Sequence, residues 1–266
     1  MDEKYPVHKS AKNGFLDDLK TLILSGKHDV NHATFELVRP LHEACLSGHL
    51  GCAQFLLENG ANVNLANIDG ATALCDACSN GNVQLVQLLL DHGALVNPPL
   101  LFSTPAHEAV YRDNWECLLL LLHHGAQVDK SDCNFGTPLH VAACKGHIKS
   151  AVVLLCAGAS TNVTKTHHAP LHEAARCQDH DFVSLLLDHG ADVYARNSQG
   201  LTPRQLVPSS TSLCKSLLQD WESTPRSLKH YCRLTIRTSL GPRRLKYLSH
   251  LGLPRIIVKY LEHVGL

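Results

Sequence analysis

Apolar positions along the chain follow a pattern that repeats about every 33 residues. Each unit has a first short stretch rich in alanine and leucine, a polar break, and a second apolar stretch that ends at a glycine. These glycines are separated by 33, 32, 33 and 32 residues: Gly60, Gly93, Gly125, Gly158 and Gly190. Two apolar stretches per unit predict a pair of helices, and one pair is too small to bury its own apolar face. We therefore expect the pairs to stack, with almost no strand beyond the tips of the connecting hairpins.

The predicted helices have termini marked by suitable residues. First helices are expected to begin near five positions: Pro40, Thr72, Pro105, Pro138 and Pro170. Proline in the first turn of a helix loses no useful N–H, because that group has no partner within the helix. A typical second helix is predicted to place Val83, Val86, Leu89 and Leu90 on one face. Gly93 is then expected to close this helix in the left-handed conformation, which glycine adopts at little cost.

Five units carry versions of one signature, most complete in Thr137-Pro138-Leu139-His140-Val141-Ala142. This segment resembles the T-P-L-H-x-A signature of the ankyrin repeat. A degenerate copy precedes the five, with His8 lying 34 residues before His42, and a truncated copy begins at Gly200. The resemblance implies an all-α fold, in which an ankyrin-repeat solenoid of six repeats plus a partial seventh occupies residues 1–207. The signature histidine is expected to hydrogen-bond between adjacent turns, which is a structural role.

The repeat pattern stops after Val207. Residues 208–212 read Pro-Ser-Ser-Thr-Ser, which predicts a short break. Leu213, Leu217 and Leu218 follow and are predicted to share one apolar face. Because a solenoid needs an element that covers its last apolar face, residues 208–223 are predicted to be a linker and a capping helix.

A unit of another kind starts at residue 224. Thr224-Pro225 predicts a helix start and Gly241-Pro242 predicts its end. Between them, Leu228, Cys232 and Ile236 recur every fourth residue, and at about 100° per residue they form one stripe. Basic residues lie mainly off this stripe: Arg226, Lys229, Arg233 and Arg237. A unit of about 43 residues is too short to bury a core alone, so the stripe is expected to need a partner.

Two motifs in this tail resemble the halves of a SOCS box. Ser-Leu-x-x-x-Cys-x-x-x-Ile, which starts at Ser227, resembles the elongin-binding half. Leu-Gly-Leu-Pro at 251–254 resembles the cullin-binding half, usually written Leu-Pro-apolar-Pro. Gly252 replaces the first proline, and this departure puts the strength of cullin binding in doubt. Because both motifs follow ankyrin-like repeats, the chain resembles the ankyrin repeat and SOCS box family. The resemblance implies a small three-helix SOCS box at residues 224–266. The alternative is a three-helix cap that binds no partner.

The resemblance implies a substrate-recognition adaptor, not an enzyme. It would join a target protein to elongin B, elongin C and cullin five with its RING subunit, promoting ubiquitination and proteasomal degradation of the target. The implied elongin-binding residues are Leu228, Cys232 and Ile236. The implied cullin-binding residues are Leu251, Leu253 and Pro254. Candidates for target binding are hairpin-tip and inner-helix residues that vary between repeats: Phe35, Glu36, Ile68, Asp69, Leu100, Leu101, Tyr111 and Arg112.

Two rival functions are compatible with parts of the sequence. The first is an ankyrin scaffold or inhibitor that sequesters its partner without ubiquitination. The second is a metal- or thiol-dependent enzyme. The nearest sequence feature to such chemistry is Cys75-x-x-Cys78, but a lone pair of cysteines without a second pair is a weak metal motif. We therefore expect no metal, no cofactor and no catalytic residues.

The composition argues against two classes of partner and against export. Lys+Arg and Asp+Glu number 24 each, and aromatic residues are only 5%, so neither nucleic acid nor a membrane surface is an expected partner. The first ten residues lack the apolar core of a secretory signal, and no apolar run approaches the ~18–20 residues that cross a bilayer. The protein is expected in the cytoplasm or the nucleus. In a reducing compartment its 11 cysteines are expected to stay unpaired, most of them as small buried apolar residues.

Overall fold

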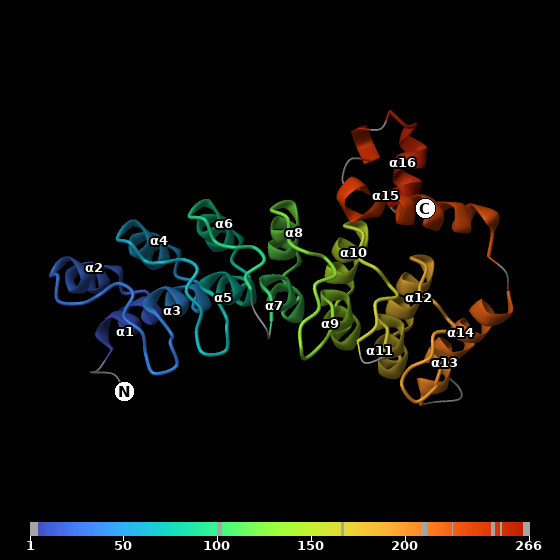
Figure 1. The fold of residues 1–266 in the computed structure, drawn as a ribbon, viewed down its shortest axis with the longest axis horizontal. Coiled ribbons are helices and arrows are strands. Elements are labelled where there is room, and N and C mark those ends of the chain that lie inside the picture. Colours follow the sequence, from blue (N-terminus) through green and yellow to red (C-terminus); the bar gives the residue numbers. More distant parts are fainter. Residues whose placement is uncertain are drawn as a thin grey trace. The chain divides into compact units, whose positions relative to one another are not determined.

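A computed structural model describes residues 5–99, 103–165, 168–208, 212–224, 226–245, 248–250 and 252–262. In these residues the secondary structure is helical apart from two isolated bridges, Ala66–Thr72 and Lys165–His168 (Figure 1). The predicted all-α class is confirmed. The chain divides into two compact units, Met1–Gln127 with Asp132–Asn134, and Val128–Ser131 with Phe135–Leu266.

The first unit is built from consecutive helix pairs, and its first helices pack on one another, as do its second helices. The pairs are α1 (Pro6–Asn13) with α2 (Leu16–Leu24), α3 (Pro40–Leu46) with α4 (Leu50–Glu58), α5 (Ala73–Asn80) with α6 (Val83–Asp91), and α7 (Pro105–Tyr111) with α8 (Trp115–His123). This arrangement buries one face of every pair against the next pair, which is the stacking that the repeat predicted.

The second unit continues the same scheme and then departs from it. Its pairs are α9 (Pro138–Lys145) with α10 (Ile148–Cys156), and α11 (Pro170–Cys177) with α12 (His180–Asp188). The single turn α13 (Pro203–Leu206) is the truncated repeat. The tail comprises α14 (Leu213–Ser223), α15 (Leu228–Leu245), the 3-10 helix η1 (Leu248–His250) and α16 (Arg255–Glu262).

The predicted helix starts are confirmed to within one residue, and the signature histidine explains part of their stability. In α9, the Thr137 hydroxyl lies 2.8 Å from His140 Nδ1, and the Thr137 amide donates to the same nitrogen at 3.2 Å. His140 Nε2 lies 3.0 Å from the His168 carbonyl oxygen of the following hairpin. His42 makes the equivalent contact with Ala71, and burial lowers its pKa to about 4. A neutral imidazole can donate from one nitrogen and accept at the other, so His42 and His140 each link their own repeat to the hairpin that follows it.

The buried face of α6 differs from the predicted one. Leu85, Val86 and Leu89 are buried, whereas Val83 is 39% exposed and Leu90 is only partly buried. Leu85 follows Val83 by two positions, about 200° around the helix, so the two cannot face the same neighbours. Apolar residues cover so wide a part of α6 that the sequence is compatible with two rotations of the helix about its axis. Contacts with α4, α5 and α8 select one of these rotations.

Helix α14, which was predicted to be a capping helix, and the helix after it also differ from expectation. Cys214 and Leu218 form the buried face of α14 against α12 and α13, while Leu213 is 73% exposed, so the predicted face is wrong at that residue. Helix α15 begins at Leu228 rather than at Thr224-Pro225, and Pro225 lies outside the described residues. It also continues through Gly241-Pro242 to Leu245, so the predicted end is wrong. An internal proline removes one helical hydrogen bond and kinks a helix without always ending it.

Candidate functional site

The apolar stripe of α15 is exposed. Leu228 is 78% exposed and Ile236 is 43% exposed, and Cys232 between them is also exposed. Tyr231, next to Cys232, is 52% exposed. Apolar side chains that remain in water at this spacing leave a helix face available to a groove of another protein.

The second motif lies immediately before α16. Leu253 is 38% exposed and Pro254 is exposed, while Leu251 lies outside the described residues. The Pro254 carbonyl accepts from the amides of Ile257 and Val258 at 2.9 and 3.1 Å, which places the proline at the helix start.

Gly252 adopts a backbone φ of 65°. Proline holds φ near −65°, so it cannot occupy this conformation. Compared with a proline at this position, Gly252 therefore gives the backbone a different path and also lacks the apolar ring.

A small core holds the tail helices together. Leu248 of η1 and Leu261 of α16 are buried, with Leu240 and Val258 packed against them. Among the described residues this core comprises four side chains, and small units generally need further support. The interface with the preceding repeats supplies some of that support, as described below.

The six described candidates for target binding are all exposed, and they fall in two places. Phe35 (91% exposed) and Glu36 lie on one hairpin, and Ile68 (60% exposed) and Asp69 lie on the next. The two hairpins are joined by the Ile68 amide, which donates to the Glu36 carbonyl at 2.9 Å.

The other two candidates, Tyr111 and Arg112, lie at the end of α7. The guanidinium of Arg112 lies 5.7 Å from the ring centroid of Tyr111. Leu100 and Leu101 lie outside the described residues.

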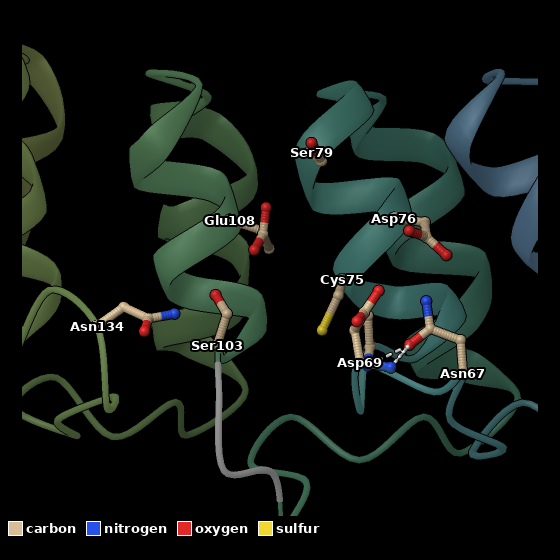
Figure 2. A pocket seen from close by; sticks show the side chains of 9 residues that line it. Asn67, Asp69, Cys75, Asp76, Ser79, Ser103, Glu108 and Asn134 are labelled. Atoms are coloured by element: carbon tan, nitrogen blue, oxygen red, sulfur yellow. Dashed lines mark hydrogen bonds between the residues drawn. The ribbon is translucent and has the colours of Figure 1, made fainter. Parts of the chain in front are cut away.

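An acidic pocket that the sequence motifs do not indicate lies between α5 and α7. It encloses about 390 Å³, and three of its lining residues are Asp69, Asp76 and Glu108. Figure 2 shows Asp76 on α5 and Glu108 on α7, with Asp69 on the hairpin before α5. The sequence does hold a signal: an acidic residue directly follows the signature histidine position in three successive repeats, as Glu43, Asp76 and Glu108.

Electrostatic repulsion and burial act together on Asp76. Burial, and secondarily the carboxylates of Glu108 and Glu43, raise its pKa from 3.8 to about 8. Glu43 is partly neutralised by Lys12, whose Nζ lies 3.6 Å from its carboxylate. The pocket thus holds a carboxyl group that keeps its proton near neutral pH.

We expect Asp76→Asn to flatten the pH dependence of stability. The folded state holds the Asp76 proton up to about pH 8, but the unfolded chain releases it near pH 4. The folded state therefore binds more protons in this window, and the wild-type free energy of unfolding falls as pH rises towards 8. Asp76→Asn should be more stable than wild type at pH 8, with Tm higher by about 2–4 °C for each kcal/mol gained.

Urea unfolding from pH 6.5 to 8.5 measures this effect. Asp220→Asn, at an exposed position of α14, is the matched control and should follow wild type. Parallel curves for Asp76→Asn and wild type would contradict the assignment.

Other chemistry is sparse in the described part of the chain. Among those residues, no group of three or more His, Cys, Asp or Glu side chains is placed to hold a metal ion. The eleven cysteines are free thiols, and six of them are buried: Cys45, Cys52, Cys75, Cys78, Cys117 and Cys214. No helix within the described ranges has the length and apolar character that crossing a membrane requires.

Comparison with known proteins identifies both parts of the chain. The family model for ankyrin repeats (3 copies) matches residues 7–99, 63–132 and 106–197, and the SOCS box model matches residues 224–262. The chain belongs to the ankyrin repeat and SOCS box family. Leu228, Cys232, Ile236, Leu253 and Pro254 all fall within the SOCS box match.

Individual relatives agree with this membership. Ankyrin repeat and SOCS box protein 9 of Mus musculus is 41% identical over 167 residues, which cover 63% of this chain and 57% of the relative. Protein 5 of the same family and organism is 40% identical over 162 residues, covering 61% and 49%. The chain thus spans about half the length of the curated relatives it matches. The crystal structure of the human ASB11 ankyrin repeat domain superposes with a TM-score of 0.77 at 38% identity, covering 84% of this chain and 99% of that one.

Proposed function

We propose that this family member is a substrate-recognition adaptor of an elongin B/C–cullin-five RING ubiquitin ligase. The observation that carries the proposal is the exposed stripe of Leu228, Cys232 and Ile236, which lies inside the SOCS box match. An amphipathic helix with apolar residues at this spacing is suited to a hydrophobic groove. Burying a large apolar side chain contributes about 1.5–3 kcal/mol, so a groove on elongin C that accepts this stripe would stabilise the complex substantially.

The cullin contact is proposed for Leu251, Leu253 and Pro254. Leu253 and Pro254 are exposed at the start of α16, which leaves them accessible to a second subunit. Because Gly252 holds a conformation that proline cannot adopt, we expect this contact to be weaker than one made through the usual Leu-Pro-apolar-Pro motif.

Target binding is proposed for the ankyrin repeats at residues 1–207, with 208–223 as linker and cap and 224–266 as the SOCS box. The paired hairpins that carry Phe35, Glu36, Ile68 and Asp69 offer both an apolar and an acidic contact. The adaptor itself performs no reaction. It raises the effective concentration of target lysines near the ubiquitin donor, which promotes ubiquitination and proteasomal degradation of the target.

Reconstitution from purified components tests this function. The full chain is co-expressed with elongin B and elongin C, and cullin five with its RING subunit is then added. We expect one stable complex on size-exclusion chromatography. Failure to retain elongin B/C would contradict the proposal and favour an ankyrin scaffold that sequesters its partner.

A further inference from the structure

Two arginines of α15 lie on the buried side of the helix, away from the exposed stripe. Arg233 is 9% exposed and Arg237 is 8% exposed, although both belong to a residue type that is seldom buried. A guanidinium that leaves water loses its hydration, and it remains charged at any physiological pH. Such burial is tolerated when the guanidinium is hydrogen-bonded, so the partners of these two groups show what the burial achieves.

Both guanidiniums donate to main-chain carbonyls in the last turns of ankyrin helices. Arg237 Nη2 donates to the Leu155 carbonyl of α10 at 2.6 Å, and Arg233 Nη2 donates to the Asp188 carbonyl of α12 at 3.1 Å. The last carbonyls of a helix lack partners within the helix and carry the negative end of its dipole. Each positively charged arginine therefore contacts the partial negative charge at the end of a helix in a different repeat.

The same arginines also contact the last helix of the SOCS box. Arg237 Nη1 donates to the Leu261 carbonyl of α16, so one guanidinium bridges α10 and α16. The guanidinium of Arg233 lies 4.9 Å from the ring centroid of Tyr260 on α16, in range of a cation–π contact. We call Arg233 and Arg237 the arginine clamp.

A close apolar contact lies between the two arginines. Leu234 packs against Gly190 at the end of α12, where a Cβ would lie only 3.0 Å from Leu234 Cδ1. The glycine lets α15 approach the last full repeat closely. The clamp and this contact together oppose rotation of α15 about its own axis.

We propose that Arg233 and Arg237 are positioning residues that fix the direction in which the exposed stripe faces relative to repeats α9–α12. This inference rests on the proposed function, because a fixed direction matters when a ligase is bound to the stripe. A target lysine is modified efficiently only when it is held near the ubiquitin donor, so a loose SOCS box would lower transfer without lowering elongin affinity. Relative motion is the usual behaviour of units joined by a small interface, and the clamp restrains it.

The test measures orientation inside the full chain, with and without elongin B/C. Spin labels are attached through genetically encoded amino acids at the exposed positions Asp181 of α12 and Lys259 of α16. Pulsed dipolar spectroscopy then gives the width of the distance distribution. We expect Arg233→Met with Arg237→Met to widen it by about twofold or more, while elongin B/C affinity stays within about threefold of wild type.

Matched variants separate positioning from general damage. Arg255→Met removes an exposed arginine of α16 and should leave the distribution unchanged. Arg233→Lys should retain most of the restraint, because a lysine can serve one carbonyl. Arg237→Lys should not, because a compact ammonium replaces a planar fork that spans two acceptors.

The outcomes distinguish the clamp from the function it serves. An unchanged width in the double variant and in Arg237→Lys overturns the clamp, whether or not elongin binds. If the double variant does not fold, the two lysine variants decide. If wild type fails to bind elongin B/C but the clamp variants still widen the distribution, the clamp stands and the ligase function fails.

Discussion

Replacing Leu228 and Cys232 together with serine is expected to weaken capture of elongin B/C by about a thousandfold. Both side chains are exposed on one stripe of α15, so packing among the described residues should depend little on them. A few anchors in a groove usually carry most of the binding energy, at about 2 kcal/mol or more each. Two such losses sum to about 4 kcal/mol, and each 1.4 kcal/mol is a factor of ten. Titration of purified elongin B/C by calorimetry measures the effect.

The matched control replaces a leucine and a cysteine with serine at exposed positions elsewhere. Leu24 is 70% exposed and Cys133 is exposed, so Leu24→Ser with Cys133→Ser repeats the chemical change away from the stripe. The control should bind elongin B/C like wild type, and both variants should keep the wild-type circular dichroism. Wild-type affinity in the stripe variant would mean that the tail motif is a chance resemblance. Loss of helicity in that variant would mean that the tail is a structural cap.

Phe182→Ala is expected to lower the free energy of unfolding by about 3–5 kcal/mol. Phe182 lies in α12, is fully buried and is the largest of the fully buried side chains among the described residues. Truncation to alanine removes the transfer free energy of the ring and leaves a cavity between packed repeats. Domains are stable by only about 5–15 kcal/mol, so this is a large fraction of the total.

Urea unfolding of the full chain measures the loss, with Phe35→Ala as the control. Phe35 is 91% exposed, and surface substitutions of this kind usually change stability by less than about 0.5 kcal/mol. Equal stability of the two variants would show that α12 is not packed as described. Because Phe35 is also a proposed target contact, the control variant serves afterwards in a target-binding assay.

Several parts of the fold were predictable because they depend on local chemistry. The starts of α3, α7, α9 and α11 follow from proline at the first turn, since that preference needs no tertiary contact. The stacking of helix pairs follows from the period, because a single pair cannot bury its own apolar face. The exposure of Leu228 follows from a short unit with too few apolar residues to cover it.

Other parts depended on neighbours that are distant along the chain. The exposure of Val83 and Leu213 reflects which side of α6 and α14 meets another helix, and apolar residues on two sides of a helix leave that choice open. The raised pKa of Asp76 comes first from burial and second from Glu108 and Glu43, which belong to adjacent repeats. The sequence shows an acidic residue in each of these three repeats, but only the stacking of the repeats brings the three carboxyl groups close together.

The sequence by itself determined the repeat, the helix pairs, a further helix after the repeats and the stripe that makes a SOCS box recognisable. These are properties of spacing along one chain. Only the tertiary structure decided that Arg233 and Arg237 face inward and that Gly252 departs from a proline-like backbone. The physical reason is that an arginine in an amphipathic helix ordinarily faces water. Its burial becomes favourable only when carbonyls from helices far away in the sequence, here at Leu155 and Asp188, replace the lost hydration.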